Sequence, residues 1–522
     1  MNKNITGALA IFVLVVIGAV GVKLIFPKYE AKQQKATSDA VKTKGKIKIA
    51  IDNWIGYFLI NSPEMKNLMR KSGYTLMCED DQADYKKRME RLKKGEIDFA
   101  VATVDSYILN AAQYNYPGTI IMVIDESKGG DAILARQDKV ASLKQLQGKT
   151  DIRIAFTPES PSHYLLKSAS DHFNLPELLP SGDLRIETDG SAMARQKLLS
   201  GEADIAVCWE PDVSLALKKK GLIKLLGTED TEKLIVDILI VNRKYAQNNP
   251  EVVRLVVNNY FKALKKYRDN NDLLIKDVGK TARLDSASVK SVLKGVHWVN
   301  FNENCEKWFD IASPGSFATE GLVETIESTA RVLISAGDFS ANPFPDEDPY
   351  RLTNCSFLEK LFTQGITGFT LPKSGNENSI PLNSIEARFS ELDDEGWNSL
   401  KEVGTLKVEP IIFQRGAFEL DLLSKKVVDQ VVERLKHYPN FRVIIKGHTS
   451  IRGDSQENLN LSQERANAVA RYLHVVYNVD QNRIRATGFG GLKPLAKKPG
   501  ESRRAFLYRL PRVELSLVRE DF

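Results

Sequence analysis

Short apolar runs alternate with amphipathic segments between residues 46 and 365. Runs rich in Val, Ile and Ala predict buried strands, and the segments between them have the spacing of helices. Strands separated by helices are typical of parallel sheets, so this region is predicted to be α/β. The predicted strands are Lys46–Ile51, Asp98–Ala102, Thr119–Ile124, Ile152–Ala155 and Asp204–Val207, and the predicted helices include Asp84–Lys94, Pro161–His172 and Ala192–Leu199.

The same region contains an internal repeat. Residues 92–101 match residues 198–207 at a constant offset of 106. Each copy has a helix end, a glycine suited to a left-handed C-cap, and an acidic residue that enters a buried strand. Beyond the strand the two copies diverge. Similar strand starts with different strand ends predict two lobes with a ligand between them, because ligands of α/β sheets bind beyond the carboxyl ends of strands.

A different pattern follows in the C-terminal part of the chain. Residues 366–405 are rich in Gly, Ser, Asn and Pro, which predicts a linker. Residues 406–522 combine four β-rich runs with two amphipathic helices, which predicts a compact α+β unit. The strands are Val408–Phe413, Arg442–Ile445, Arg483–Gly488 and Arg512–Val518, and the helices are Ser424–Lys436 and Ser462–Val476.

The N-terminus carries an apolar segment. Ile5–Val22 is 18 consecutive residues without a charge, which nearly spans a bilayer core at a rise of about 1.5 Å per residue. A cleaved signal peptide is the alternative, although its apolar region is usually about 7–15 residues long. We therefore expect a single transmembrane anchor over residues 1–26 and a polar tether over residues 27–45.

Composition narrows the classes of function. The chain has 522 residues, 43% hydrophobic and 27% charged, which describes several globular domains and excludes a disordered or collagen-like protein. The net charge is +6, with +8 in residues 411–522, and this mild excess does not require nucleic acid as a partner. The four cysteines lie far apart, which argues against a zinc site. If an exported chain forms a disulfide, Cys305 and Cys355 are the expected pair.

The sequence lacks familiar catalytic motifs. It has no HExxH segment and no Gly-x-Ser-x-Gly elbow. Residues 147–150 read Gln-Gly-Lys-Thr, but the upstream glycine of a P-loop would fall at Leu143. We expect no enzyme activity, no cofactor and no metal.

Three motifs give residues 46–365 a resemblance to a known family. They are Gly95-Glu-x-Asp98-x-Ala100 with its repeat, Trp54-Ile-Gly56-Tyr57, and Ser142–Gly148 before the strand Arg153–Ala155. The region resembles type-II periplasmic solute-binding proteins, which serve ABC transporters for nitrate, sulfonates, taurine and thiamine precursors. The resemblance implies two lobes that close on a small solute.

Candidate ligand residues follow the predicted strands. Trp54 and Trp209 offer aromatic faces, although each fits a core position equally well. Residues 127–131 and the helix start at Pro161 could present backbone N–H groups to an anion. Ser162 is most simply an N-cap, and His163 is more typical of a satisfied first-turn histidine than of a ligand contact. The candidates are Trp54, Tyr57, Asp105, Ser106, Ser127, Gly129, Gly130, Ser160, Ser162, His163, Trp209, Glu210 and Asp212.

The charge of the solute stays open at this stage. A helix N-terminus favours an anion, whereas Glu210 and Asp212 in the cleft would repel one. We expect a small anion or zwitterion, with an amine or a peptide fragment as the alternatives.

The most specific motif lies near the C-terminus. Gly447-His-Thr-Ser450 is followed by Leu461-Ser-Gln-Glu-Arg465-Ala466, with Phe413–Gly416 before it and Arg485–Gly490 after it. About 110 residues here resemble the OmpA-like peptidoglycan-binding domain. In that family an Asp, at the position of Ser450, and the Arg matched by Arg465 hold the diaminopimelate stem of peptidoglycan.

The wall-binding motif departs from the family at several positions. Ser450 replaces the usual Asp, which predicts a loss of about 1.5–3 kcal/mol, or about tenfold to a hundredfold in affinity. Asp454 is a candidate substitute. The family's Asn-Arg-Arg-Val appears as Leu510-Pro-Arg512-Val513. The peptidoglycan-binding candidates are Thr449, Ser450, Asp454, Asn458, Leu461, Arg465 and Arg512.

These features predict a single-pass inner-membrane protein whose bulk lies in the periplasm of a Gram-negative bacterium. Its predicted function is that of an ABC-transport-type solute receptor attached to peptidoglycan, with a permease as candidate partner. The alternative is a structural protein between membrane and wall, whose ligand-free lobes act as a spacer or partner platform. An ion-driven stator is disfavoured because Ile5–Val22 contains no acidic residue.

Overall fold

The computed structural model describes residues 43–311, 318–364, 389–407, 409, 411, 413 and 416–519. The predicted membrane segment, most of the tether and half of the predicted strand Val408–Phe413 lie outside these residues. Among the described helices, none combines the length and apolar character needed to cross a bilayer.

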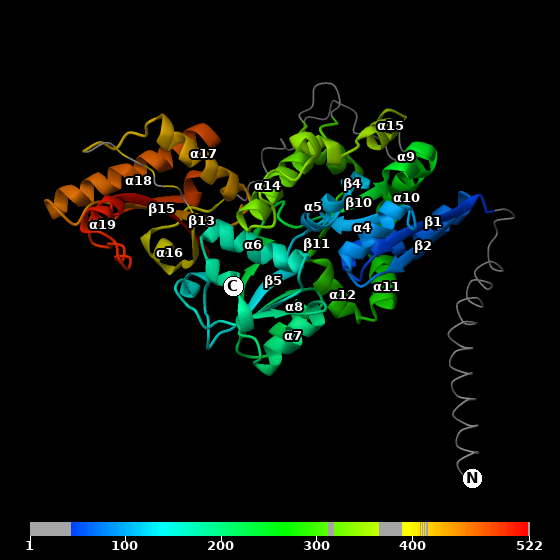
Figure 1. Cartoon of the computed structure of the whole chain (residues 1–522), viewed down its shortest axis with the longest axis horizontal. Coiled ribbons are helices and arrows are strands. Elements are labelled where there is room, and N and C mark those ends of the chain that lie inside the picture. The colour runs from blue at the N-terminus through cyan, green and yellow to red at the C-terminus, as the bar shows by residue number, and fades with distance from the viewer. Residues whose placement is uncertain are drawn as a thin grey trace, which may run out of the picture.

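Lobe 1 is built on a six-stranded sheet with the order β11-β4-β10-β3-β1-β2 (Figure 1). β1 pairs in parallel with β2 and β3, whereas β10 is antiparallel to both β3 and β4. The strands are β1 (Gly45–Ile51), β2 (Tyr74–Asp80), β3 (Phe99–Thr103), β4 (Gly118–Ser127), β10 (Val236–Asn242) and β11 (Val296–Trp298). The helices are α2 (Phe58–Asn61), α3 (Pro63–Lys71), α4 (Tyr85–Lys94), α5 (Val104–Ala111), α9 (Arg243–Asn248), α10 (Pro250–Asp269), α11 (Asn271–Ala282), α12 (Ser286–Leu293), α13 (Phe301–Glu303) and α15 (Ser356–Gln364).

Lobe 2 has a five-stranded sheet with the order β7-β6-β8-β5-β9. β6 is parallel to β7 and β8, and β5 is antiparallel to β8 and β9. Both sheets are therefore mixed rather than parallel as predicted, because each contains a strand that has just crossed from the other lobe. The elements are β5 (Asp131–Arg136), β6 (Ile154–Phe156), β7 (Arg185–Glu187), β8 (Ile205–Trp209), β9 (Leu222–Gly227), α6 (Pro161–Phe173), α7 (Ser191–Ser200) and α8 (Asp212–Leu217).

Two short connections join the lobes. Residues 128–130 lead from β4 to β5, and residues 228–235 lead from β9 back to β10. Helix α14 (Gly321–Ser335) packs against α5 of lobe 1 and α6 of lobe 2. On the lobe 2 side, Tyr164 Oη lies 3.3 Å from Thr329 Oγ1 of this helix. The lobes are thus linked by two crossings and one bridging helix.

The structure confirms the internal repeat. Gly95 ends α4 and Gly201 ends α7, both in the left-handed conformation with φ of 71° and 82°. The acidic residue that follows plays the same part in each lobe. Asp98 accepts a hydrogen bond from Lys48 N–H at 2.9 Å, and Asp204 accepts one from Arg153 N–H at 3.1 Å. Each carboxylate ties the start of its strand to the neighbouring parallel strand.

The C-terminal module is a four-stranded sheet with the order β12-β15-β13-β14, covered by helices. Its first strand falls inside the predicted linker, so that boundary was wrong. Trp397 and Val403 are buried there, because β12 pairs with β15 and adds its apolar side chains to the module's core. The elements are α16 (Asp394–Ser399), β12 (Lys401–Leu406), α17 (Leu422–Lys436), β13 (Arg442–His448), α18 (Ser455–Tyr477), β14 (Ile484–Gly488), α19 (Arg503–Arg509) and β15 (Arg512–Arg519).

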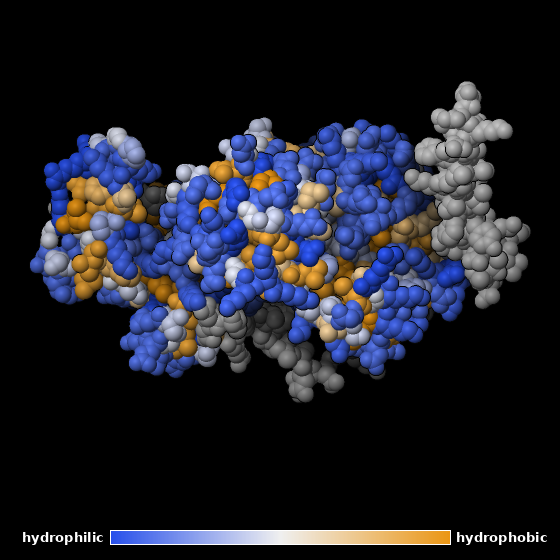
Figure 2. All heavy atoms as spheres, turned by 90° about the horizontal axis from the view of Figure 1, so that it is seen from below, coloured by the Kyte–Doolittle hydropathy of each residue, from blue (hydrophilic) through white to orange (hydrophobic). Residues whose placement is uncertain are grey.

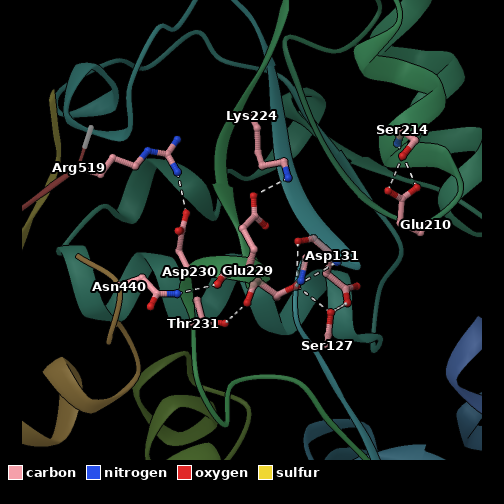
Figure 3. A network of polar contacts seen from close by, with 12 residues as sticks. Ser127, Asp131, Glu210, Ser214, Lys224, Glu229, Asp230, Thr231, Asn440 and Arg519 are labelled. Carbon is pink, nitrogen blue, oxygen red and sulfur yellow. Dashed lines mark hydrogen bonds and ion pairs between the residues drawn. The ribbon is translucent and has the colours of Figure 1, made fainter. Parts of the chain in front are cut away.

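The module docks on the 228–235 connection between the lobes (Figures 1 and 3). The contacts join the end of α17 and the end of β15 to the backbone and one carboxylate of this connection. They are Glu232 N–H to His437 O at 2.9 Å, His437 Nδ1 to Glu232 O at 2.8 Å, Asn440 Nδ2 to Glu229 O at 3.0 Å, and Arg519 Nη1 to Asp230 Oδ2 at 2.7 Å.

The module also packs against the C-terminal end of α6. His172 Nδ1 lies 2.8 Å from Tyr438 Oη and the His172 ring stacks on His437 at 5.5 Å. A Cβ on Gly404 would lie 2.6 Å from the Phe173 ring, so this strand approaches lobe 2 too closely for a side chain. The apolar core runs without interruption from lobe 2 into the module.

All four cysteines are free thiols in the structure, so Cys305 and Cys355, the pair expected if the chain forms a disulfide, are not bonded to each other here. Cys305 is fully buried among the apolar side chains of lobe 1. The Cys355 thiol is half-buried at the start of α15, with its Sγ 3.4 Å from Glu359 Oε1. Burial raises the pKa of the Cys305 thiol to about 12, which makes it unreactive.

Candidate functional site

A cavity lies between the lobes, where the carboxyl ends of strands from both sheets meet. The volume of this cavity is about 20 Å³. In this closed arrangement the cavity holds about one water molecule. The lining residues are Asp52, Trp54, Tyr57, Ala83, Tyr85, Thr103, Asp131, Pro161, Trp209, Ile235 and Asp237.

Two buried carboxyl groups of lobe 1 stand behind the aromatic wall. The Tyr57 hydroxyl donates to Asp237, and Trp54 Nε1 donates to Asp125 Oδ1 at 3.1 Å. Gly56 permits this approach, because a Cβ there would lie 2.1 Å from Asp125 Oδ2. Packing therefore requires a glycine at this position of the Trp54-Ile-Gly56-Tyr57 motif.

Asp52 belongs to an ion network that is already satisfied. Arg88 Nη2 lies 3.1 Å from Asp52 Oδ2, and the same guanidinium pairs with Asp81 and donates to Val101 O at 2.7 Å. The Arg88 side chain is fully buried. Tyr85 Oη adds a longer contact to Asp52 at 3.3 Å. The one guanidinium near the cavity is therefore committed to these partners.

Asp131 is the first residue of β5, directly after the first crossing, and lines the cavity. Figure 3 shows it beside Ser127. Ser127 Oγ donates to Asp131 Oδ2 at 2.7 Å and lies 2.7 Å from Thr228 Oγ1. Gly129 N–H and Asp131 N–H both donate to Thr228 Oγ1, at 2.9 and 3.1 Å. Because Thr228 begins the second crossing, these bonds hold the two connections together. They also occupy two of the backbone N–H groups that were predicted to bind an anion, those of Gly129 and Asp131.

The carboxyl groups at the cavity hold their protons unusually well. Burial raises the pKa of Asp125 to about 7, of Asp131 to about 7 and of Asp105 to about 6. Burial, and then repulsion from Asp125, raise the pKa of Asp237 well above its ordinary value. Asp125 Oδ2 has no donor when every carboxyl group is ionised, whereas a protonated Asp237 supplies one. We therefore place a proton on Asp237 near neutral pH.

The structure brings some of the predicted ligand residues to the cavity. Trp54 and Tyr57 line it from lobe 1, and Trp209 lines it from lobe 2. Gly130 packs against the Trp54 ring, since a Cβ on Gly130 would lie 2.2 Å from that ring. Asp105 is buried behind Thr103 and accepts from Ser106 Oγ at 3.2 Å.

Two predicted acidic residues serve helices instead. Glu210 accepts from Ser214 Oγ at 2.6 Å and from Ser214 N–H at 3.1 Å, and Figure 3 shows this pair apart from the Asp131 cluster. Asp212 Oδ1 lies 2.8 Å from Arg195 Nε of α7, an ion pair without hydrogen-bond alignment. The two carboxylates stabilise α8 and the packing of α7 rather than the cavity wall.

The start of α6 differs from expectation. Its N-cap is Ser160, whose hydroxyl donates to Thr157 O at 2.7 Å and makes no bond to the helix. Ser162 lies inside the first turn, so its predicted N-cap role was wrong; its hydroxyl is buried without a partner. His163 packs on Phe156 with ring centroids 4.6 Å apart, and burial lowers the pKa of His163 to about 3.

Sequence reasoning missed several lining residues. A single Asp inside an apolar strand was the available signal, since Asp125 ends the run 119–124 and Asp237 interrupts the run 236–241. A charged residue in such a run is buried on both faces of the sheet and needs a partner. The missed residues are Asp52, Ala83, Tyr85, Thr103, Asp125, Asp131, Pro161, Ile235 and Asp237.

The wall-binding loop connects β13 to α18. Thr449 N–H donates to Gly490 O at 2.9 Å, which holds the loop against the turn after β14. Ser450 Oγ accepts from Arg452 N–H at 3.2 Å. Arg465 is buried under the loop, with Nε 3.1 Å from Ala417 O and its guanidinium 4.9 Å above the Phe413 ring.

The structure assigns Asp454 to a different task. Its carboxylate accepts from Gln456 and Glu457 N–H at 2.9 Å each, which makes it the N-cap of α18. Arg465 lies eleven residues further along that helix, about 16 Å along the axis. Asp454 is thus poorly placed to replace the carboxylate that position 450 lacks.

Other candidates near the loop are also engaged. Arg512 Nε pairs with Glu514 Oε1 at 2.6 Å, and His448 Nε2 lies 3.5 Å from Glu514 Oε2 while its ring stacks on Phe489. Asn458 Nδ2 donates to Arg452 O at 2.9 Å. Leu461 is only partly buried near the loop.

Exposed apolar side chains gather on the module. Figure 2 shows a mostly hydrophilic face with scattered apolar patches, some of them on the module at the left of the view. Ile451 of the wall-binding loop and Leu492 of the turn beside it are 51% and 76% exposed. The module's other large exposed apolar residues are Phe418, Leu422, Leu423, Val475, Val476 and Tyr508.

A larger open hollow of about 690 Å³ lies at the far edge of lobe 2, away from the interlobe cavity. Two of its cationic side chains, Arg136 and Lys219, have partners. Arg136 pairs with Asp138 at 3.0 Å, and Lys219 Nζ donates to Leu199 O at 2.6 Å. We give functional weight to the interlobe cavity, because both lobes contribute to it. Among the described residues, no group of His, Cys, Asp and Glu is arranged to hold a metal ion.

Known families match both parts of the chain. The NMT1/THI5 like family matches residues 80–272, and the OmpA family matches residues 412–506. The taurine-binding periplasmic protein of Escherichia coli is 24% identical over 240 residues, which cover 44% of this chain and 71% of that protein. The peptidoglycan-associated lipoprotein of Buchnera aphidicola is 28% identical over 144 residues, covering 27% of this chain and 78% of the lipoprotein.

Other relatives match over smaller shares. Outer membrane porin F of Pseudomonas aeruginosa is 32% identical over 119 residues, so this chain spans about a third (34%) of the porin's length. Among solved structures, the periplasmic aliphatic sulphonate binding protein SsuA of Escherichia coli has a TM-score of 0.41 and 18% identity, covering 49% of this chain and 86% of SsuA. The chain thus carries an NMT1/THI5-like domain fused to a C-terminal OmpA-family domain.

Proposed function

We propose that this protein is a membrane-anchored periplasmic receptor for a small solute, fixed to peptidoglycan through its C-terminal module. The observation that carries the proposal is the interlobe cavity, to which strand ends of both lobes contribute beside two crossing connections. A taurine-binding protein and a peptidoglycan-associated lipoprotein match the two parts. Residues 1–26 supply the proposed anchor.

The proposed mechanism is closure of the two lobes on the solute. The connections 128–130 and 228–235 act as the hinge, and their side chains and backbone are tied together at Thr228. The closed receptor presents the solute to a partner, for which an ABC-type permease is the candidate. Because the taurine-binding protein and the peptidoglycan-associated lipoprotein that match the two parts are named for binding or wall association, we assign no catalytic role to the cavity.

The C-terminal module anchors the receptor to the wall. In this proposal Arg465 binds the carboxylate end of the peptidoglycan stem, as a guanidinium fork suits a carboxylate. Ser450 offers only a hydroxyl to the ammonium group of that stem. We therefore expect wall binding that is weaker than in relatives with an Asp at this position.

A structural role is the second candidate. The cavity in its closed form holds about one water molecule, which also suits lobes that serve as a rigid spacer. In this alternative the module still attaches to the wall, and the lobes present a surface to a partner protein.

Two measurements on the full-length chain in detergent test the proposal. Sedimentation with purified sacculi should deplete the protein from the supernatant, and Arg465→Ala should reduce this at least tenfold, whereas the exposed Arg351→Ala should not. A thermal-shift screen of small solutes should raise the unfolding midpoint, because a ligand at 100 times its Kd adds about 2.7 kcal/mol. Wall binding without any solute response would favour the structural role.

A further inference from the structure

We propose that the interlobe cavity binds a small organic cation with N–H donors, such as an ammonium or guanidinium group. This inference rests on the proposed receptor function and names its ligand class. Three carboxyl groups line the cavity, Asp52, Asp131 and Asp237, together with aromatic rings from both lobes. No lysine or arginine is among the described lining residues.

The nearest cations are engaged elsewhere. Arg88 is fully buried, and its guanidinium is already bonded to Asp52, Asp81 and Val101 O rather than directed toward a ligand in the cavity. Lys128 Nζ, on the first crossing, pairs with Glu126 at 2.8 Å and donates to Thr231 O at 2.8 Å. Arg88 compensates Asp52, but an anion entering this cavity would still meet Asp131 and Asp237, which form no ion pair in the described structure, whereas a cation would complete the site.

The aromatic walls suit a cation as well. Trp54 and Trp209 are both half-buried and approach the cavity from opposite lobes, with Tyr57 and Tyr85 beside them. The face of an indole or phenol ring attracts a positive charge within about 6 Å, by about 0.5–2 kcal/mol according to its desolvation. Carboxyl groups that accept N–H bonds, combined with such faces, distinguish an organic cation from a small anion.

Protonation gives the inference a measurable signature. Without a ligand, buried carboxyl groups keep protons that a bound cation would displace, since the cation favours the ionised form. Binding should therefore release protons and become tighter as the pH rises from 6 to 8. Besides one another, Asp125, Asp131 and Asp237 interact with the titratable groups of Asp52, Asp105, Glu210, His297, Tyr57, Tyr85 and Tyr260.

The size of the cavity limits the ligand. The cavity volume of about 20 Å³ is far below that of ordinary ligand pockets, which is about 300–1,000 Å³. Since the closed form has room for about one water molecule, the lobes must open for entry and close around a compact head group. A monoamine, a diamine or an alkylguanidine fits this limit, whereas a polymer fragment exceeds it.

Isothermal titration of the full-length chain tests this inference with matched probes that differ in charge. The cations are benzylamine, putrescine and agmatine; the comparison solutes are benzenesulfonate, taurine and nitrate, with CaCl₂ as a metal probe. We expect at least one organic cation to bind at least a hundredfold more tightly than the anions benzenesulfonate and nitrate and the zwitterion taurine. Repeating the titration in buffers with different ionisation enthalpies should show proton release.

Isosteric variants locate the binding. Asp131→Asn and Asp237→Asn should each weaken cation binding at least tenfold, whereas Asp183→Asn, an exposed position of the same lobe as Asp131, should leave it unchanged. The unfolding midpoints of the variants without ligand show whether each one is folded. Both amides keep the shape of the carboxyl group and remove a buried ionisable group, so we expect the midpoints to be maintained.

The outcomes separate this inference from the proposed function. Binding of taurine or benzenesulfonate, but of no cation, would overturn the cation class and leave the receptor function standing. Binding of Ca²⁺ alone, or cation binding that both Asn variants retain, would also overturn it. No response to any probe would count against the inference and the receptor function together.

Discussion

The interlobe cavity and the wall-binding loop lack side chains of opposite charge. In the cavity, Asp131 and Asp237 are buried among aromatic rings, and no lysine or arginine lines the described wall. In the loop, Arg465 retains its place below the motif while position 450 lacks the family's carboxylate. The two sites therefore differ in what a ligand must bring: a positive charge to the cavity, and a carboxylate to Arg465.

Burial acts to raise the pKa of acidic side chains at both sites, but the two sites neutralise these side chains in different ways. Burial raises the pKa of Asp131 to about 7, so a proton takes the place of a cation. Near the loop, burial would raise the pKa of Glu514, but His448 and Arg512 outweigh it and lower that pKa to about 2. A closed cavity thus neutralises its acids by protonation, whereas the module pairs Glu514 with cations.

The largest expected effect comes from removing the one guanidinium near the cavity. Arg88→Leu leaves the carboxylates of Asp52 and Asp81 without their cationic partner, so we expect the free energy of unfolding to fall by about 3–5 kcal/mol. Urea unfolding of the full-length chain measures this loss. Arg91→Leu is the matched control on the same helix, because its pair with Glu79 is partly exposed and worth about 1 kcal/mol or less. Equal losses for the two variants would contradict the distinction.

The sequence predicted the lobes better than it predicted the cavity. The 106-residue repeat located Asp98 and Asp204, because a local motif of helix end, glycine and strand recurs in both lobes. The cavity instead combines residues more than 100 positions apart, such as Tyr57 and Asp237, and their contact depends on a strand that crosses between the lobes. Sequence periodicity carries no information on that crossing.

The same contrast appears in the C-terminal part of the chain. The loop motif and Arg465 were recognised because they are contiguous in the sequence. By contrast, β12 was hidden in a segment rich in small residues, where Gly404 is required by its approach to the Phe173 ring of lobe 2. Close packing between the module and lobe 2 requires a glycine at position 404, whereas a glycine in the sequence alone indicates a linker.

Restoring the missing carboxylate should give the next largest effect. Ser450→Asp should strengthen binding to diaminopimelate-containing sacculi by about tenfold to a hundredfold, since a charge-assisted hydrogen bond contributes about 1.5–3 kcal/mol. Ser399→Asp adds the same charge at an exposed site of the module and should leave sacculus binding unchanged. If both variants bind sacculi more tightly, the effect is due to net charge. If neither does, Ser450 is not part of the binding site.

Stability should depend on pH in opposite directions at the two sites. The folded state raises the pKa of Asp131 from its ordinary value to about 7, so it binds more protons than the unfolded chain between about pH 4 and 7. Its contribution to stability is therefore present at low pH and is lost as the pH rises through 7, by up to about 1.4 kcal/mol per pH unit. Asp131→Asn should reduce this dependence when urea unfolding is compared at pH 5 and 8, and Asp125, Asp105 and Asp237 should maintain the rest, since their pKa values are raised as well.

Glu514 provides the opposite case. Because its folded-state pKa is lowered to about 2, its contribution is present above the ordinary pKa of a glutamate and is lost as the pH falls from about 4.5 toward 2. Glu514→Gln should weaken the module at pH 7 and change little at pH 2. Asp183→Asn should keep the wild-type slope in both ranges, and the same slope in all variants would show that neither carboxyl group carries the effect.

The smallest effect concerns the contact that joins the two regions. Arg519 pairs with Asp230 on the 228–235 connection, and both side chains are partly exposed, so Arg519→Ala should weaken docking by about 1 kcal/mol. The backbone N–H of Glu232, which donates to His437 O at 2.9 Å, reports this docking directly through hydrogen exchange. We expect about fivefold faster exchange at Glu232 in the variant, and no change in Arg351→Ala, whose ion pair with Asp346 is far more exposed. Unchanged exchange at Glu232 would mean that the apolar contact of Phe173 and Tyr438, rather than the ion pair, holds the module on lobe 2.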